Sequence, residues 1–247
     1  MTKYLLDYEA HLVAFSRESE LLALASADAL VEPVPTCPDW SVRDLVEHLG
    51  SVFVFWRAQL ESGDPDGRRE LGEHGSPAGS DLVGWYSEAA HDLLVELTEH
   101  DATDPCWNWS GANPTARWVA RRMALEAAVH RFDAELAAGS DSTVPTDLAV
   151  DGIDERIAVH LAADLPEETG ATLGGVICLA CSDSAAAWTV EIAGGRLRWR
   201  KGRGPADAVL VGTASDLFLF TWNRVRIDAL ELTGSVDVAS AWKTLPV

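Results

Sequence analysis

The stretch ALEAAVHRFDAE, residues 124–135, holds the side chains on which the fold and the site of this chain depend. Alanine and leucine dominate it, which favours a helix. Glu126 and His130 stand four residues apart and therefore project from the same helical face. Small residues flank both, which leaves room beside them. Because a carboxylate in a core is costly unless it is paired or bound to a metal, this face indicates a polar site.

Apolar residues recur at helical spacing in four segments of the first half of the chain. They predict helices over residues 4–28, from the N-cap Ser41 to about residue 60, over 80–100 and over 116–138. The loop VEPVPTCPDW precedes Ser41, and Asp44 stands three positions after it as a partner in a capping box. Four helices that close one core predict a four-helix bundle.

The pattern changes after GSDSTVPTD, and the second half mixes helices with strands. A helix is predicted over 147–163, and others over 215–225 and 236–245. Strand-like runs follow the first of these helices at 171–183, 186–194, 195–202 and 207–213, and Gly194–Gly195 indicates a hairpin turn between two of them. We therefore expect two domains, a helical bundle over 1–142 and a smaller α+β domain over 143–247.

Charge and cysteine content exclude several classes of protein. The chain has 247 residues, with 39 acidic against 19 basic residues and a net charge of −20. That charge argues against nucleic acid or an anionic membrane as a partner, since both need concentrated Lys and Arg. The N-terminus does not read as a signal peptide and no run is long enough to span a membrane. Four cysteines do not make a disulfide scaffold. We expect a cytoplasmic monomer that binds small molecules.

His48 raises the same question as the pair on the fourth segment, because it borders the apolar stripe of the second helix. Two imidazoles and one carboxylate from facing helices are typical of a catalytic zinc site, in which three protein ligands leave a coordination position open. The alternative is that Glu126 pairs with His130 or with Arg122 at the i,i+4 spacing. Spacing leaves both interpretations open. Asp133, three residues after His130, could orient that ligand or be a solvated carboxylate.

The cysteines offer little chemistry of their own. Cys178 and Cys181 form a C-x-x-C motif within a predicted strand. Residues three apart on a strand face opposite sides, which argues against a joint zinc site or redox pair. Cys37 precedes a proline in the loop before the second helix, and packing is its default role.

Two motifs of the bundle resemble a known family. TCPDWSVRDLVEHLG (36–50) and RWVARRMALEAAVHRFDAE (117–135) are similar to segments of the mycothiol-dependent maleylpyruvate isomerase family. The stretch WTVEIAGGRLRWRKGRGPADAVLVGTASDLFLFTWNR (188–224) resembles the C-terminal domain of that family more loosely. The resemblance covers nearly the whole chain. It implies a DinB-like metal-binding four-helix bundle followed by a sterol-carrier-like α+β domain.

The resemblance also implies site residues and a reaction. The family's metal ligands fall on His48, Glu126 and His130, and the divalent metal is usually zinc. A family arginine implicated in the chemistry falls on Arg224, where the preceding residue is Asn223 instead of the more frequent Gly, and Arg226 is a close competitor. A helix C-cap is the other interpretation of Arg224. The cofactor is mycothiol or a similar low-molecular-weight thiol.

The activity implied is cis–trans isomerisation of a small electrophilic acid. The metal-activated thiolate adds to the double bond, the bond rotates, and elimination releases the trans product, while Arg224 binds a carboxylate or the enolate charge. If the adduct is kept, the same site is a mycothiol S-conjugating transferase. A third alternative is a non-catalytic, metal-containing binder of small molecules.

Overall fold

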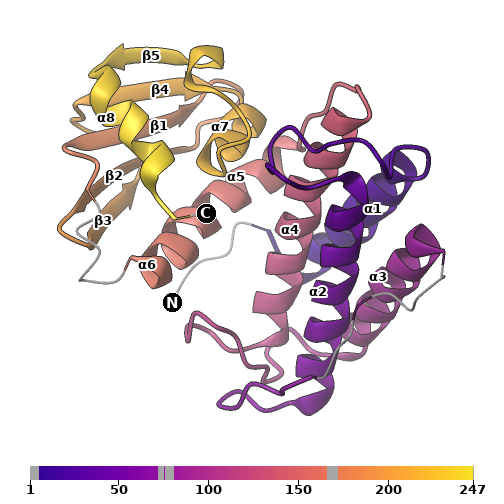
Figure 1. Cartoon of the computed structure of the whole chain (residues 1–247). Helices are drawn as coiled ribbons and strands as arrows, with labels where there is room; N and C mark the ends of the chain where they lie inside the picture. Colours follow the sequence, from indigo (N-terminus) through magenta and orange to yellow (C-terminus); the bar gives the residue numbers. More distant parts are fainter. Residues whose placement is uncertain (1–5, 72–74, 76–80, 166–171, 247) are drawn as a thin grey trace. The chain divides into compact units, whose positions relative to one another are not determined.

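The computed structural model describes residues 6–71, 75, 81–165 and 172–246 (Figure 1). The chain divides into two compact units, with Leu6–Ser142 in one and Thr143–Val247 in the other. In the described part of the chain, no helix combines the length and the apolar character needed to cross a bilayer. The predicted fold class, a helical bundle followed by a smaller α+β domain, is confirmed.

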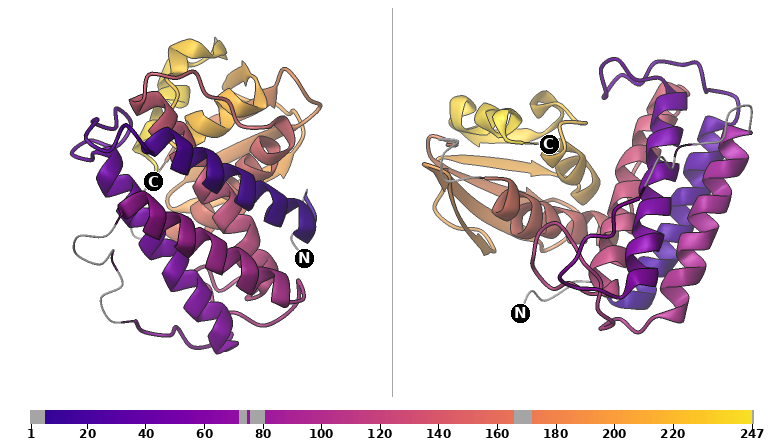
Figure 2. Two further views of the ribbon diagram at one scale, coloured as in Figure 1. Left: turned by 90° about the vertical axis from the view of Figure 1, so that its right-hand side faces the viewer. Right: turned by 60° about the horizontal axis from the view of Figure 1, so that its bottom comes forward.

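Four long helices form the first unit. They are α1 (Tyr8–Ser26), α2 (Val42–Ser62), α3 (Leu82–Glu99) and α4 (Ala116–Ala137). Figure 2 shows them side by side along their lengths. Each lies within three or four residues of its predicted bounds, because apolar spacing and caps both mark these helices.

The helix ends follow the predicted capping chemistry. Ser41 accepts a hydrogen bond from the Asp44 backbone, and the Asp44 side chain accepts one from the Ser41 backbone, so the capping box before α2 is present. Asp7 and Asp81, which were not predicted as caps, each accept one backbone hydrogen bond at the N-termini of α1 and α3, without the reciprocal bond of a capping box. Helix α2 ends at Gly63, whose φ of 60° lies in the left-handed region that glycine adopts without strain.

The core of the bundle is continuous and close-packed. Phe15 of α1 meets Phe53 of α2 edge to face, with ring centroids 5.0 Å apart. Gly50 of α2 allows the Trp85 ring of α3 to approach, since a Cβ at position 50 would lie 2.2 Å from that ring. Helix α4 is buried on most of its faces, including small residues such as Ala127 and Ala134. Several of its polar side chains, among them His130 and Asp133, are therefore in the interior.

The second unit packs helices on a mixed five-stranded sheet. Helix α5 (Thr146–Glu155) continues through a π-helical turn (Arg156–His160) into α6 (Leu161–Asp164). The strands are β1 (Val176–Cys181), β2 (Ala187–Ala193), β3 (Arg196–Lys201), β4 (Ala208–Gly212) and β5 (Glu231–Gly234). Their order is β3-β2-β1-β4-β5, and β1 and β4 are parallel. Helices α7 (Ala214–Thr221) and α8 (Val236–Ala241) complete the unit.

Three features of this unit bear on the predictions. Gly194 and Gly195 have φ values of 58° and 71°, as a tight hairpin between β2 and β3 requires. Cys178 and Cys181 are buried free thiols in β1, as predicted for packing residues. Strand β5 has no counterpart in the sequence prediction, because four residues carry too little alternation to indicate a strand.

Candidate metal centre

Three side chains from two helices converge inside the bundle. His48 lies on α2, and Glu126 and His130 lie one turn apart on α4. The Oε1 atom of Glu126 lies 3.5 Å from Nε2 of His130 and 3.8 Å from Nε2 of His48. All three candidate ligand atoms lie within 4.8 Å of one another. The sequence-predicted residues are thus brought together.

The donor set and its spacing fit a divalent cation. Two ligands of a tetrahedral zinc ion, at bond lengths of about 2.0–2.1 Å, stand about 3.3 Å apart. The two Oε1–Nε2 distances are slightly longer, so small side-chain rotations bring the three atoms to one ion. Imidazole and carboxylate donors suit zinc and other first-row divalent metals. The His48 side chain is 38% exposed against 10% for His130, so a small molecule can approach from the His48 side.

Arg122 fixes the outer oxygen of Glu126. Its guanidinium donates to Oε2 at 2.6 Å, so the carboxylate faces the two imidazoles with Oε1 alone. Burial acts to raise the pKa of Glu126, but the Arg122 charge, His130 and His48 together hold that pKa well below its usual range. The ion pair between Arg122 and Glu126 and the cluster of His48, Glu126 and His130 are therefore both present. The ion pair keeps Glu126 ionised.

Asp133 orients His130 from the other side of the ring. Its Oδ2 lies 2.9 Å from Nδ1 of His130. A carboxylate can only accept, so Nδ1 carries the proton and Nε2 faces Glu126. Burial acts to lower the pKa of His130, yet hydrogen bonds and charge from Asp133 and Glu126 raise it to about 9. A cation at Nε2 would compete with a proton held there. Asp133 is fully buried, so it is not the solvated carboxylate of the alternative interpretation.

The loop before α2 holds Asp133 in place. Thr36 Oγ1 donates to its Oδ1 at 2.5 Å, and the Cys37 thiol donates to its Oδ2 at 3.6 Å. The loop is closed by a backbone bond from Val34 N to Trp40 O at 2.9 Å, and Asp39 takes a left-handed φ of 71° within it. The segment T-C-P-D-W therefore supports Asp133 and, through it, the candidate ligand His130, which stands nearly a hundred residues away on α4.

Trp40 forms a wall of the site. Its ring centroid lies 5.1 Å from that of His48 and 6.5 Å from that of His130, with the second pair stacked at 15°. An indole beside two imidazoles removes water from one side of them and restricts their rotation. Periodicity did not reveal Trp40 or Thr36 as site residues. The feature of the sequence that could have indicated them is the loop that precedes the capping box of α2, which is rich in proline.

A second group of metal-ligand type shares His130. Cys37, His130 and Asp133 also lie within 4.8 Å of one another. Here the imidazole would bind through Nδ1, the atom that already bonds Asp133. Both Asp133 oxygens accept hydrogen bonds from Thr36, Cys37 and His130. Because these contacts account for the buried carboxylate, we interpret this group as support for His130.

The predicted catalytic arginine lies in the second unit. Arg224 follows α7, and its Nη1 donates to the carbonyl of Trp222 at 2.8 Å, a contact that satisfies a helix C-terminus. Asn223 has a φ of 61°, a left-handed conformation open to Asn and Gly, so the replacement of Gly at this position keeps the turn. Arg226 is 81% exposed and pairs with Asp228 at 2.8 Å.

Comparisons with known proteins identify the family and the fold of the chain. Residues 13–135, about half of the chain, match the mycothiol maleylpyruvate isomerase N-terminal domain. Crystal structures of the mycothiol-dependent maleylpyruvate isomerase and of a histidine-to-alanine mutant share the fold, with TM-scores of 0.63 and 0.61 at 14% and 15% identity. Both alignments cover 95% of this chain and 98% of the other. No curated protein matches the chain. The chain belongs to the mycothiol-dependent maleylpyruvate isomerase family.

Proposed function

We propose that this chain is a thiol-dependent metalloenzyme in which His48, Glu126 and His130 hold a divalent cation, with zinc the metal that this donor set suits best. One observation carries the proposal. Two imidazole nitrogens and one carboxylate oxygen converge on a point that is open on the His48 side. Three protein ligands leave room for one more, as catalytic zinc sites require.

Side chains around the proposed cation site orient its three candidate ligands. Asp133 fixes the tautomer of His130 that presents Nε2. Arg122 keeps Glu126 ionised and directs Oε1 inward. Trp40 shields the two imidazoles. When bound, the cation supplies Lewis acidity that deprotonates a coordinating thiol near neutral pH.

The co-substrate of the proposed reaction is mycothiol or a similar small thiol, and the substrate is a small electrophilic acid with a cis double bond. The sulfur adds to one alkene carbon, and the electron pair of the double bond moves to the adjacent carbonyl as an enolate. The carbon–carbon bond then rotates. When the enolate re-forms the double bond, the thiolate leaves, so the products are the trans isomer and unchanged thiol. Family membership supports this chemistry.

Arg224 is proposed to stabilise the enolate or to hold a substrate carboxylate. Its competitor Arg226 is bound to Asp228 at the surface, which supports the choice of Arg224. Replacing Arg224 by Ala should lower kcat/KM for the acid substrate without changing metal content, whereas Arg226→Ala should leave kcat/KM near the wild-type value. Equal losses in the two variants would count against a catalytic role for Arg224.

The test of the proposed function is product analysis on zinc-loaded protein given mycothiol and maleylpyruvate. The proposal expects the trans isomer to form only when thiol is present, with no consumption of the thiol. A stable thioether adduct would instead identify an S-conjugating transferase that uses the same site. No turnover, with metal retained and thiol bound, would identify a non-catalytic binder and contradict the enzyme assignment.

A further inference from the structure

Helix α1 presents an ordered line of side chains to solvent on the face opposite its core contacts. The line, here called the α1 seam, has spacings of 3, 4, 3, 4 and 3 residues and consists of Ala10, Val13, Arg17, Glu20, Leu24 and Ala27. Val13 is 69% exposed and Leu24 is 74% exposed. Alternating three- and four-residue spacing is the pattern that packs one helix along another. The seam therefore has the form of a helix-pairing surface that no element of the described chain covers.

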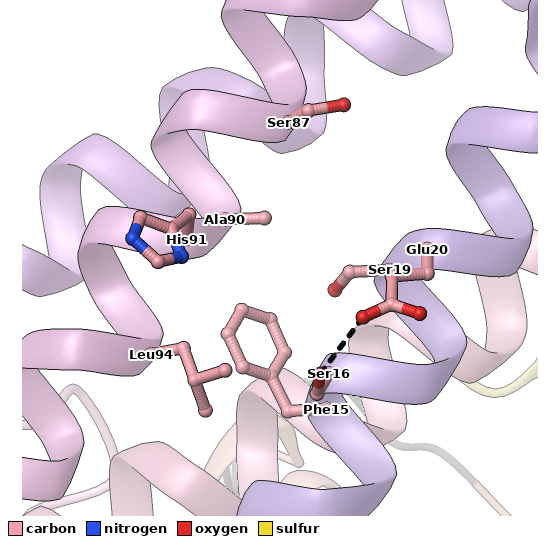
Figure 3. Close-up of a pocket in the computed structure, with 8 residues that line it drawn as sticks. All are labelled: Phe15, Ser16, Ser19, Glu20, Ser87, Ala90, His91 and Leu94. Carbon is pink, nitrogen blue, oxygen red and sulfur yellow. Dashed lines mark hydrogen bonds between the residues drawn. The ribbon is translucent and has the colours of Figure 1, made fainter.

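The surface beside the seam is hollowed. A groove of about 640 Å³ runs between α1 and α3, and Val13, Leu21, Leu24 and Leu94 supply apolar walls. A smaller pocket of about 130 Å³ shares lining residues with it and is lined by Phe15, Ala90 and Leu94 among others (Figure 3). Figure 3 shows Ser16 bonded to Glu20 at its edge. A second helix lying on the seam would bury this apolar surface.

The order of residues in the seam is self-complementary. Its positions are symmetric about the midpoint between Glu18 and Ser19. In an antiparallel pair of α1 helices, Val13 faces Leu24 of the partner subunit and Arg17 faces Glu20 of the partner subunit, while alanines meet at both ends. A parallel pair would place Arg17 against Arg17 and Glu20 against Glu20, which costs free energy.

The charges of Arg17 and Glu20 face solvent and are accessible to a second molecule. Arg17 is exposed, and no ion pair to it is found among the described residues. Within the part of the chain that the structure describes, Glu20 accepts a single hydrogen bond, from Ser16 at 3.2 Å. Both charges are thus available to a second molecule, and two copies related by a two-fold axis satisfy both at once.

We propose that this chain forms an isologous homodimer through antiparallel pairing of the α1 seam. Helix α1 has 19 residues and is about 28 Å long. Contacts along one helix of this length bury an area at the small end of specific interfaces. We therefore expect the dimer to be weak. His48 and His130 lie on other helices, so pairing leaves the candidate metal centre in place.

Sedimentation equilibrium over a concentration series at low salt tests the dimer. We expect the mass to rise from 26.6 kDa toward twice that value and then to stop, because an isologous contact closes at two copies. A mass that stays at 26.6 kDa at every concentration, as the sequence-based expectation of a monomer has it, would overturn the proposal. A mass that continues to rise past two copies would also overturn it.

Charge reversal tests the register. Arg17→Glu and Glu20→Arg each place like charges together across the seam, and each should weaken the dimer at least about tenfold, which corresponds to 1.4 kcal/mol. The double variant R17E/E20R restores opposite charges and should recover the wild-type Kd. Both substitutions are at exposed positions, and circular dichroism of the three variants checks the fold. A dimer that neither single variant weakens, or that the double variant does not restore, rules out this seam.

Discussion

Helices α1 and α4 both carry many charged side chains, but they place them in opposite surroundings. On α4 most of the polar side chains are buried, namely those of Arg121, Arg122, His130, Arg131 and Asp133. On α1 Arg17 and Glu20 are exposed, while Glu18 between them is fully buried. Buried charge must be paired or bound to a metal, whereas exposed charge is satisfied by water. Burial therefore separates charges that build a site from charges that are open to another molecule.

The charged and polar side chains of α4 contribute to two networks. His130 and Glu126 face His48 at the candidate metal centre. Arg131, the next residue after His130, instead forms ion pairs with Glu18 of α1 and with Glu135, and donates to Ser142 at 2.9 Å. The first network belongs to the candidate metal centre, and the second ties α1 to α4. The following substitutions separate their roles.

The largest effect is expected from removing a metal ligand that only one of the two candidate groups contains. His48→Ala should abolish zinc retention after dialysis together with thiol-dependent turnover, because two protein ligands remain at the proposed site. Cys37→Ser is the matched control and should retain the metal. His130→Ala cannot distinguish the groups, since both share His130. Metal retained in His48→Ala and lost in Cys37→Ser would reverse the ligand assignment.

The next largest effect is expected in the free energy of unfolding, where the adjacent α1 residues Glu18 and Arg17 should differ. Glu18→Gln leaves the buried Arg131 with weaker compensation, and we expect the free energy of unfolding of the bundle to fall by about 3 kcal/mol. Arg17→Gln, on the exposed face, should change it by less than about 0.5 kcal/mol in dilute solution. Urea unfolding of both variants measures the difference. Similar urea midpoints for the two variants would show that burial does not determine how much each charged side chain contributes to stability.

Asp133→Asn tests the support of His130. The amide keeps the shape of the side chain but replaces one accepting oxygen with a donor, so His130 loses its fixed orientation. We expect zinc affinity to fall by about 10- to 100-fold, measured by competition with a chromophoric chelator. Thr36→Val removes only one hydrogen bond to Asp133 and should have a smaller effect. Unchanged affinity in Asp133→Asn would exclude the orienting role.

The smallest effect is expected at Gly50, where α2 meets α3 through an aromatic side chain. Gly50→Ala places a Cβ against the Trp85 ring and should lower the free energy of unfolding by about 1 kcal/mol, since the partly exposed indole can move. Trp85→Leu in the same chain should recover part of that loss. A double-mutant cycle of thermal unfolding measures the coupling between the two positions. If the losses of stability in the two single variants simply add in the double variant, contact with the Trp85 ring is not the reason for glycine at position 50.

The sequence predicts the parts of this molecule that depend on local spacing. Helical periodicity and caps located the four helices, and the i,i+4 spacing placed Glu126 and His130 on one face. His48 was identified by its position beside an apolar stripe. Each of these inferences uses residues within a few turns of one another, where the geometry of a helix is fixed.

Contacts between distant segments could not be predicted in the same way. Thr36 and Asp133 are 97 residues apart, and the bond between them depends on how a loop folds back onto α4. The orientation of Trp40 depends on that loop as well. The π-helical turn within the predicted helix over 147–163 also leaves no trace in the apolar pattern. Tertiary packing decides all three.

Zinc K-edge X-ray absorption of the zinc-loaded protein tests the central claim most directly, because the two candidate ligand groups differ in sulfur. Without added thiol, we expect only nitrogen and oxygen ligands at about 2.0–2.1 Å, with the scattering pattern of two imidazoles. Addition of mycothiol should introduce one sulfur at about 2.3 Å. A sulfur ligand already present before thiol is added would place the metal at Cys37 and contradict the account.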